Sequence, residues 1–238
     1  APRWLATAVD LQARQAERFG DAERGGYYFV ARDADPLLFR DKPIHDGALP
    51  SGNSVAVMNL LRLHSLTAEE AHRVAAERAL AAFRSELAAA PLLAPAMLAA
   101  LDFHLGVVKE IVLVRPDAAA DLGPFLDVLA RSYLPNAVLA VVTERGGSAD
   151  EARLLARLVP WAEGKVARDG AVTAYVCERR VCKLPTSDPA RFAAQLAARS
   201  GAAALAPGAP PPAPAAGAAA LPAVQGETSG ESAASESR

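Results

Sequence analysis

The chain has 238 residues, of which 52% are hydrophobic and 22% are charged, and its formal net charge at pH 7 is −2. A chain of this length buries a core large enough for one large domain or two small ones. The slightly acidic balance, with a pI of about 6.1, argues against a nucleic-acid-binding protein, which needs a basic surface. No uninterrupted apolar run reaches the roughly 18 residues of a membrane span. We therefore expect neither nucleic acid nor membrane as a partner.

The start of the chain indicates whether the sequence is a fragment, and its cysteine content indicates the cellular compartment. The chain begins without a methionine, and residues 1–20 lack the basic-then-apolar layout of a signal peptide. We therefore expect a fragment or a processed product. The 2 cysteines are too few for a disulfide scaffold and favour a reducing compartment. The expected location is the cytoplasm or the lumen of an organelle.

The residues up to 106 are predicted to be mainly helical. Residues 4–19 place apolar side chains along one side of a helix, which Gly20 ends. A Gly-Gly turn followed by aromatic residues predicts a short strand or hairpin at 27–30. An irregular, aspartate-rich segment follows. The next helix, over 55–66, is apolar nearly all round and is expected to be buried.

Two further helices complete this first part. Thr67 and Glu70 match a capping box, which predicts a long helix over 68–89. Pro91 and Pro95 mark a break, and another helix is predicted over 96–105. Helices joined by so short a link form an antiparallel hairpin.

From residue 107 the pattern alternates between short β-branched runs and helices. Strands are predicted at 107–114, 138–143, 172–177 and 181–184, with helices at 121–133, 148–159 and 189–198. Continuous apolar strands alternating with helices predict a small parallel or mixed sheet covered by helices. The expected domains are helical hairpins over 1–106 and an α/β subdomain over 107–200. Residues 201–238 are rich in Ala, Pro, Gly and Ser, which predicts a disordered tail.

The polar loop 46–54 precedes the apolar helix and is the first candidate for a binding site. Asn53 and Ser54 are expected to cap that helix, and caps can also contact ligands. Cleavage of a glycosidic bond needs two carboxyl groups, and the irregular segment carries four, although aspartates in such segments usually form turns. These are Asp33, Asp35, Asp41 and Asp46, of which Asp46 is the candidate catalytic residue. The candidate ligand-binding residues are Gly26, Tyr27, Asp46, Ser51, Asn53 and Ser54. The run Tyr27–Phe29 is either core or a platform on which a sugar stacks.

Other motifs are mostly absent. The sequence has no phosphate-binding GxxxxGK[ST], no GxGxxG, no HExxH and no GxSxG. Its 4 histidines do not have metal-ligand spacing, so neither a metal nor another cofactor is predicted. Cys177 and Cys182 flank a predicted hairpin turn. They form a redox pair, a structural disulfide or two small hydrophobic side chains on adjacent strands, and the sequence leaves these alternatives open.

Four separated strings together resemble one family. They are GGYYFVARD, DGALPSGNSVAVMNLLRLHSLT, LPNAVLAVV and TAYVCERRVCKLPTSDP. In this order they are similar to the C-terminal part of the thioredoxin-domain-containing proteins related to spermatogenesis-associated protein 20, and the resemblance covers residues 4–198. It implies a mainly α fold, with the terminal hairpins of an (α/α) toroid similar to six-hairpin glycosidases and sugar epimerases, then a small α/β subdomain. It also implies that residues 46–54 and 25–28 line a ligand funnel.

The same resemblance implies a partner. Family members carry an N-terminal thioredoxin-like domain and the remainder of the toroid, and both are missing from this chain. Our first hypothesis is a non-catalytic structural or interaction module that helps a redox domain recognise its partner. The rival hypothesis is a carbohydrate-active enzyme, an epimerase or glycosidase relative, that binds a sugar or another small molecule with Asp46 in the pocket. A truncated toroid should expose apolar helix faces, so we expect the chain to be marginally stable or oligomeric.

Overall fold

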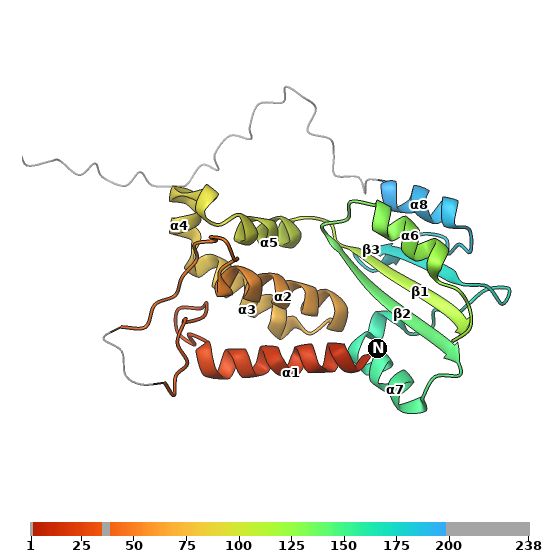
Figure 1. Ribbon diagram of the computed structural model, residues 1–238, viewed down its shortest axis with the longest axis horizontal. Helices are drawn as coiled ribbons and strands as arrows, with labels where there is room; N and C mark the ends of the chain where they lie inside the picture. Colours follow the sequence, from red (N-terminus) through yellow and green to blue (C-terminus); the bar gives the residue numbers. More distant parts are fainter. Residues whose placement is uncertain (1, 35–38, 199–238) are drawn as a thin grey trace, which may run out of the picture. The chain divides into compact units, whose positions relative to one another are not determined.

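The computed structural model describes residues 2–34 and 39–198, and all of its helices, strands and contacts belong to these ranges. The tail predicted to be disordered, 201–238, lies outside the described residues, as does Asp35. Within the described ranges a helical part comes first and a mixed helix-and-sheet part follows (Figure 1). This agrees with the predicted mixture of helix and sheet, and the division into domains at residue 106 stays a prediction.

The elements follow one another in a simple order. The helices are α1 (Pro2–Phe19), α2 (Gly52–Thr67), α3 (Glu70–Ala82), α4 (Arg84–Ala89), α5 (Pro95–Leu105), α6 (Gly123–Arg131), α7 (Ala149–Leu158) and α8 (Pro189–Ala197), with 3-10 turns η1 (Pro91–Leu93) and η2 (Pro160–Ala162). The strands are β1 (Lys109–Asp117), β2 (Ala137–Arg145), β3 (Thr173–Glu178) and β4 (Val181–Cys182).

The four strands form one mixed sheet in the order β2-β1-β3-β4. Strands β1 and β2 are parallel and joined through α6, whereas β3 runs antiparallel to β1. Alternate side chains of β1 enter two cores. Ile111 and Leu113 pack with α6 and α8, whereas Val112 and Val114 pack with α7 and η2. Helices thus cover both faces of β1 (Figure 1), which explains why its sequence is apolar without alternation.

Helix α2 is the centre of the helical part. It packs against α3 and α5, and its buried apolar residues include Val57, Leu60 and Leu61. The same core takes in Val138 of β2. The indole N–H of Trp161, in η2, donates to the backbone oxygen of Leu66 at 2.9 Å. The helical part and the sheet are therefore joined both by apolar packing and by a hydrogen bond at the end of α2.

Three local predictions were wrong. Residues 27–30 form no strand, and Tyr27 makes only an isolated bridge to Gly20, because the positive φ of Gly25 and Gly26 turns the chain away from extended geometry. The helix predicted over 68–89 is interrupted at Phe83. The capping box at Thr67 does not form. Thr67 is the last residue of α2, and its hydroxyl donates to the backbone oxygen of Leu63.

The strand predicted to end at Arg115-Pro116 continues to Asp117. Its pairing with β3 stops at Val114, while its pairing with β2 goes on. Beyond Val114, β1 is therefore an edge on one side. A proline, which has no N–H to donate, is tolerated at such an edge.

Gly25 should be irreplaceable, whereas Gly52 should not. At Gly25 φ is +78°, and an added Cβ would lie 2.6 Å from the backbone oxygen of Arg78; at Gly52 an added Cβ would meet nothing within 4 Å. We expect Gly25→Ala to lower the free energy of unfolding by about 1–3 kcal/mol. Gly52→Ala, the matched control at the start of α2, should leave it unchanged or raise it by about 0.4–1 kcal/mol. Urea denaturation followed by circular dichroism measures both, and equal stability of the two variants would contradict the assigned backbone strain.

Candidate functional site

Asp46 is bound by the backbone of the chain itself. One carboxylate oxygen accepts the N–H of Ser51 at 2.7 Å and the other accepts the N–H of Ala96 at 2.7 Å. Ala96 lies in the first turn of α5, whose own N-cap residue, Ala94, offers no side-chain bond. The first N–H groups of a helix lack intrahelical partners, and a negative charge there is favourable. Asp46 therefore caps α5 from a position fifty residues earlier in the sequence.

These bonds also set the protonation of Asp46. Burial by itself would raise the pKa of this carboxyl, but the hydrogen bonds from Ser51, Ser54 and Ala96 outweigh it and leave the pKa below its usual value. A carboxylate of this kind is ionised at neutral pH and does not donate a proton. Because both oxygens already hold backbone donors, Asp46 acts as a structural anchor.

The two serines and Asn53 are also engaged. Ser51 is the N-cap of α2, since its hydroxyl accepts the N–H of Ser54 at 3.1 Å; the expectation that Asn53 and Ser54 are the caps was wrong. The hydroxyls of Ser51 and Ser54 lie 2.8 Å apart. The amide of Asn53, whose residue is only 1% exposed, accepts from the N–H of Tyr27 at 2.7 Å and donates to the backbone oxygens of Tyr27 and Pro43, both at 2.9 Å.

The Gly25–Tyr28 segment packs against these groups. A Cβ at Gly26 would lie 3.0 Å from the Phe83 ring and 3.3 Å from Oδ1 of Asn53. Tyr27 is buried, and its hydroxyl accepts from the side chain of Gln12 at 3.1 Å. The structure therefore places three of the predicted ligand-binding residues, Gly26, Tyr27 and Asn53, next to one another. They contact one another within the fold.

Sequence reasoning missed Asp21, which anchors the same segment. Its carboxylate accepts the N–H groups of Glu23 and Arg24, the Lys42 ammonium at 2.9 Å and the Tyr28 hydroxyl at 2.8 Å. The backbone N–H of Arg24, followed by the side chain of Lys42, holds the pKa of Asp21 far below its usual range. The available signal was an aspartate directly after the glycine that ends α1.

The other two candidate aspartates in the described part of the chain, Asp33 and Asp41, make contacts of their own. Asp33 is exposed and lies 3.0 Å from the guanidinium of Arg18. Asp41 contributes its backbone oxygen, which accepts from the N–H of Phe29 at 2.8 Å. No group of three or more metal-ligating side chains occurs among residues 2–34 and 39–198. The same ranges contain no helix long and apolar enough to cross a membrane.

A small hollow lies beside the aromatic segment. It is lined by Gln15, Phe19, Tyr27, Tyr28, Phe29, Pro43, Gly52 and Asn53, with a volume of about 190 Å³. Small-molecule sites usually have volumes of about 300–1,000 Å³. None of the lining residues is a carboxylate, and Asp46 is not one of them. The hollow therefore lacks the acid and base that glycosidic chemistry needs.

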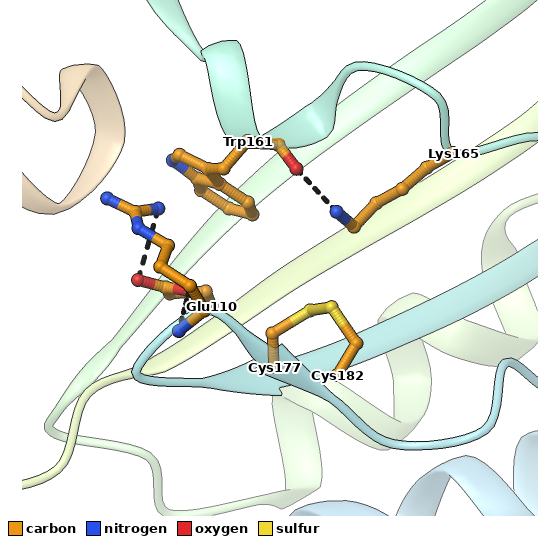
Figure 2. The surroundings of a disulfide bond; sticks show 6 residues. Glu110, Trp161, Lys165, Cys177 and Cys182 are labelled. Carbon is orange, nitrogen blue, oxygen red and sulfur yellow. Dashed lines mark hydrogen bonds and ion pairs between the residues drawn. A yellow bond between two sulfur atoms is a disulfide. The ribbon is translucent and has the colours of Figure 1, made fainter.

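The two cysteines form a second candidate site. Cys177 on β3 and Cys182 on β4 lie directly opposite each other and are joined by a disulfide (Figure 2). Arg179 and Arg180, at the tip of the turn between these strands, both have positive φ. Two such residues are typical of a tight two-residue hairpin turn. Of the alternatives that the sequence left open, the structure has the disulfide.

A buried carboxylate accompanies this disulfide. Glu110 of β1 pairs in register with Cys177 and is buried. Its carboxylate accepts the N–H of Arg180 at 3.3 Å and lies 3.1 Å from the Arg180 guanidinium. Burial raises the pKa of Glu110, and the charge of Arg180 opposes that rise. Sequence reasoning missed this pair, although a single glutamate within an apolar strand signals a buried partner.

Trp161 and Lys165 cover the same corner. The Arg180 guanidinium lies 5.3 Å from the centre of the Trp161 ring, and the Lys165 ammonium lies 5.8 Å from the centre of the Tyr175 ring. Lys165 also donates to the backbone oxygen of Trp161 (Figure 2). Burial lowers the pKa of Lys165. The disulfide thus borders a partly buried cluster of two cations, one carboxylate and two aromatic rings.

The fold and these clusters define a mixed helical and sheet protein whose polar loop residues are held internally and whose edge strand carries a disulfide. No protein-family model matches the chain. It is 33% identical over 187 residues to spermatogenesis-associated protein 20 of Homo sapiens, and the match covers 78% of this chain and 23% of the relative. The Rattus norvegicus protein of that name is 32% identical over 187 residues and the Mus musculus protein 32% over 189, with the same coverage.

The chain is therefore related to the spermatogenesis-associated protein 20 family, which confirms the resemblance found in its sequence. The match involves the C-terminal part of these relatives, and the chain spans 23% of their length.

Asp46→Asn should destabilise the protein in a pH-dependent manner. Replacing the carboxylate removes a charged acceptor of two N–H bonds, so we expect a loss of about 1.5–3 kcal/mol in the free energy of unfolding at pH 7. Because the folded-state pKa lies below the unfolded value, this stabilisation is present above about pH 4 and is lost as the pH falls through the folded pKa. Denaturant titrations from pH 3 to 7 measure the difference.

The control for this variant is Asp41→Asn. Asp41 is exposed, so its replacement should change stability by less than about 0.5 kcal/mol. A difference between Asp46→Asn and wild type that stays constant from pH 7 to pH 3 would contradict the anchoring role.

Proposed function

We propose that this chain is a non-catalytic C-terminal structural and interaction module within a longer protein of the spermatogenesis-associated protein 20 family. One observation carries the proposal: the polar residues of the loop 46–54 are occupied by the chain's own backbone. Asp46 holds Ser51 and Ala96, and Asn53 holds Tyr27 and Pro43. Groups committed in this way stabilise the fold, and their positions are fixed by the backbone they bind.

An open apolar groove supports the interaction role. It lies on α3, α4 and α5, has a volume of about 500 Å³, and is lined by Leu80, Ala81, Leu87, Ala88, Leu98, Leu101 and Leu105, together with Glu77, Arg84 and His104. Leu105 is 73% exposed. Contiguous exposed apolar surface typically marks an interaction site. We infer that another part of the same polypeptide covers this groove in the longer protein.

In this proposal α1–α5 are the terminal hairpins of an (α/α) toroid, and the covering segment is an earlier hairpin of that ring. A thioredoxin-like domain N-terminal to the ring is the further partner. The relatives extend far beyond the matched region, which is 23% of their length, and this leaves room for such segments. The α/β part packs against α1 and α2. Such packing between the two parts is what a module that positions other domains needs.

The rival function is a carbohydrate-active enzyme. The aromatic hollow beside Tyr27 and Tyr28 is the observation that favours it, since sugars stack on aromatic rings. The absence of a carboxylate from the lining of that hollow, and the commitment of both Asp46 oxygens, weigh against it. We therefore rank the module first.

A ligand screen separates the two functions. Wild type and Asp46→Asn are heated with a panel of sugars and sugar phosphates. We expect no saturable rise in melting temperature for either, because Asp46 is bound to backbone N–H groups and does not line the aromatic hollow. Asp41→Asn is the matched control. Saturable stabilisation of wild type and Asp41→Asn that Asp46→Asn abolishes would favour the enzyme and contradict the module.

The groove should make the isolated chain self-associate. We expect Leu105→Lys to weaken self-association by about tenfold or more, because burial of one leucine contributes about 1.5–3 kcal/mol. Lysine suits the last turn of α5, where a cation is favourable. Leu184→Lys is the matched control, since Leu184 is 83% exposed and lies outside the groove. Sedimentation equilibrium measures the dissociation constants. A monomer at all concentrations, or equal effects of the two variants, would contradict the interaction surface.

A further inference from the structure

The two cysteines of the disulfide differ in their exposure to solvent. Cys177 lies on β3 and is only 1% exposed, in the core that includes Val112 and Tyr175. Cys182 is exposed, on the two-residue edge strand β4. Thiol–disulfide exchange requires a thiolate to reach one of the two sulfurs. Cys182 is therefore the more accessible of the two cysteines to a thiolate from solution.

The hairpin does not depend on the disulfide alone. Beyond Cys182 the edge continues to pair with β3: the N–H of Lys183 donates to the oxygen of Val176 at 2.9 Å, and Ala174 and Thr186 exchange bonds of 2.8 and 3.1 Å. At the turn, Arg180 is held by Glu110. Opening the disulfide thus leaves this backbone pairing in place, so exchange does not require the sheet to unfold.

Two cations and one carboxylate lie near the disulfide. Arg180 belongs to the turn that the disulfide closes. Lys165 contacts Tyr175, which projects from the same face of β3 as Cys177, and Trp161 and Lys165 lie on the disulfide's side of the sheet (Figure 2). Two cations against one carboxylate, Glu110, leave a net positive charge at this corner. Cations near a thiol favour its thiolate form, whereas burial among apolar side chains, as at Cys177, opposes it.

We propose that Cys177–Cys182 is a thiol–disulfide exchange site for an external dithiol, with Cys182 as the attacked sulfur and Cys177 as the buried leaving and resolving sulfur. A thiolate of the dithiol forms a bond to Sγ of Cys182, the bond to Sγ of Cys177 breaks, and Cys177 takes the electron pair and a proton. The second thiolate of the dithiol then attacks its own sulfur in the mixed disulfide and releases Cys182, which is protonated. Two electrons pass to the cystine, and the dithiol leaves as a disulfide.

Trapping the mixed disulfide tests which sulfur is attacked. The full chain is incubated briefly with glutathione, quenched in acid and analysed by peptide mass spectrometry. We expect glutathione on Cys182 at about tenfold or greater excess over Cys177, following the difference in exposure. Equal adducts on both residues, or an excess on Cys177, would overturn the assignment.

Single-cysteine variants give a matched comparison. Cys177→Ser leaves the exposed thiol and Cys182→Ser leaves the buried one. We expect the thiol of Cys177→Ser to react with dithionitrobenzoate about tenfold or more faster than that of Cys182→Ser. Equal rates in two variants that keep the wild-type circular dichroism would overturn the proposal.

Reduction of the wild-type chain tests the exchange without relying on variants. With dithiothreitol as the dithiol, the rate should rise in proportion to its concentration, and the circular dichroism should be retained throughout. The opening rate of the β1 amides, measured by hydrogen exchange in the same buffer, is the reference. A reduction rate that is independent of dithiothreitol and equal to that opening rate would show that the disulfide reacts only through unfolding, which would overturn the proposal.

Discussion

The side-chain amide of Asn53 is the interaction on which the helical part most depends. The chain between α1 and α2 forms no strand in its described residues, so its backbone groups lack the partners that a sheet would give them. Buried backbone N–H and C=O groups need partners, and leaving one unmet costs about 1–3 kcal/mol. Asn53 supplies three, bonding both backbone groups of Tyr27 and the oxygen of Pro43. Asp46 and Asp21 likewise accept backbone N–H groups, those of Ser51 and Ala96 and those of Glu23 and Arg24. The polar residues of this region therefore replace secondary structure.

This internal use of polar groups determines where the chain can meet other molecules. Asp46 joins the loop before α2 to the start of α5, and Trp161 joins the end of α2 to η2, which packs against the sheet. Both ends of α2 are thereby fixed within the fold. Two open features are different in kind: an apolar groove lined by α3, α4 and α5, and an exposed cysteine on the edge strand. The first suits association and the second suits exchange.

Sequence patterns were sufficient where the cause of structure is local. The β-branched runs predicted the strands, and Ser148 and Asp188 begin α7 and α8 as their N-caps. Patterns were insufficient where the partner is distant. The loop around Asp46 was recognised as special, but its bond to Ala96 joins residues fifty positions apart, and no local periodicity signals that. Glu110 and Arg180, which form an ion pair, are even further apart in the sequence, by 70 positions. Phe83, at which the predicted helix is interrupted, has its ring buried in the core of the helical part, and sequence periodicity did not signal the break.

Residue type alone does not separate a structural loop from a catalytic one. Asp, Ser, Asn and Gly are favoured at helix starts and tight turns for the same reason that they are useful to an enzyme: they offer short, well-placed hydrogen-bonding groups. What separates the two roles is whether those groups have spare capacity. Both oxygens of Asp46 already hold backbone N–H groups, whereas Cys182 is an exposed residue and its partner, Cys177, is buried. By this criterion we place the proposed chemistry of the described chain at the edge of its sheet and assign the polar loop a structural role.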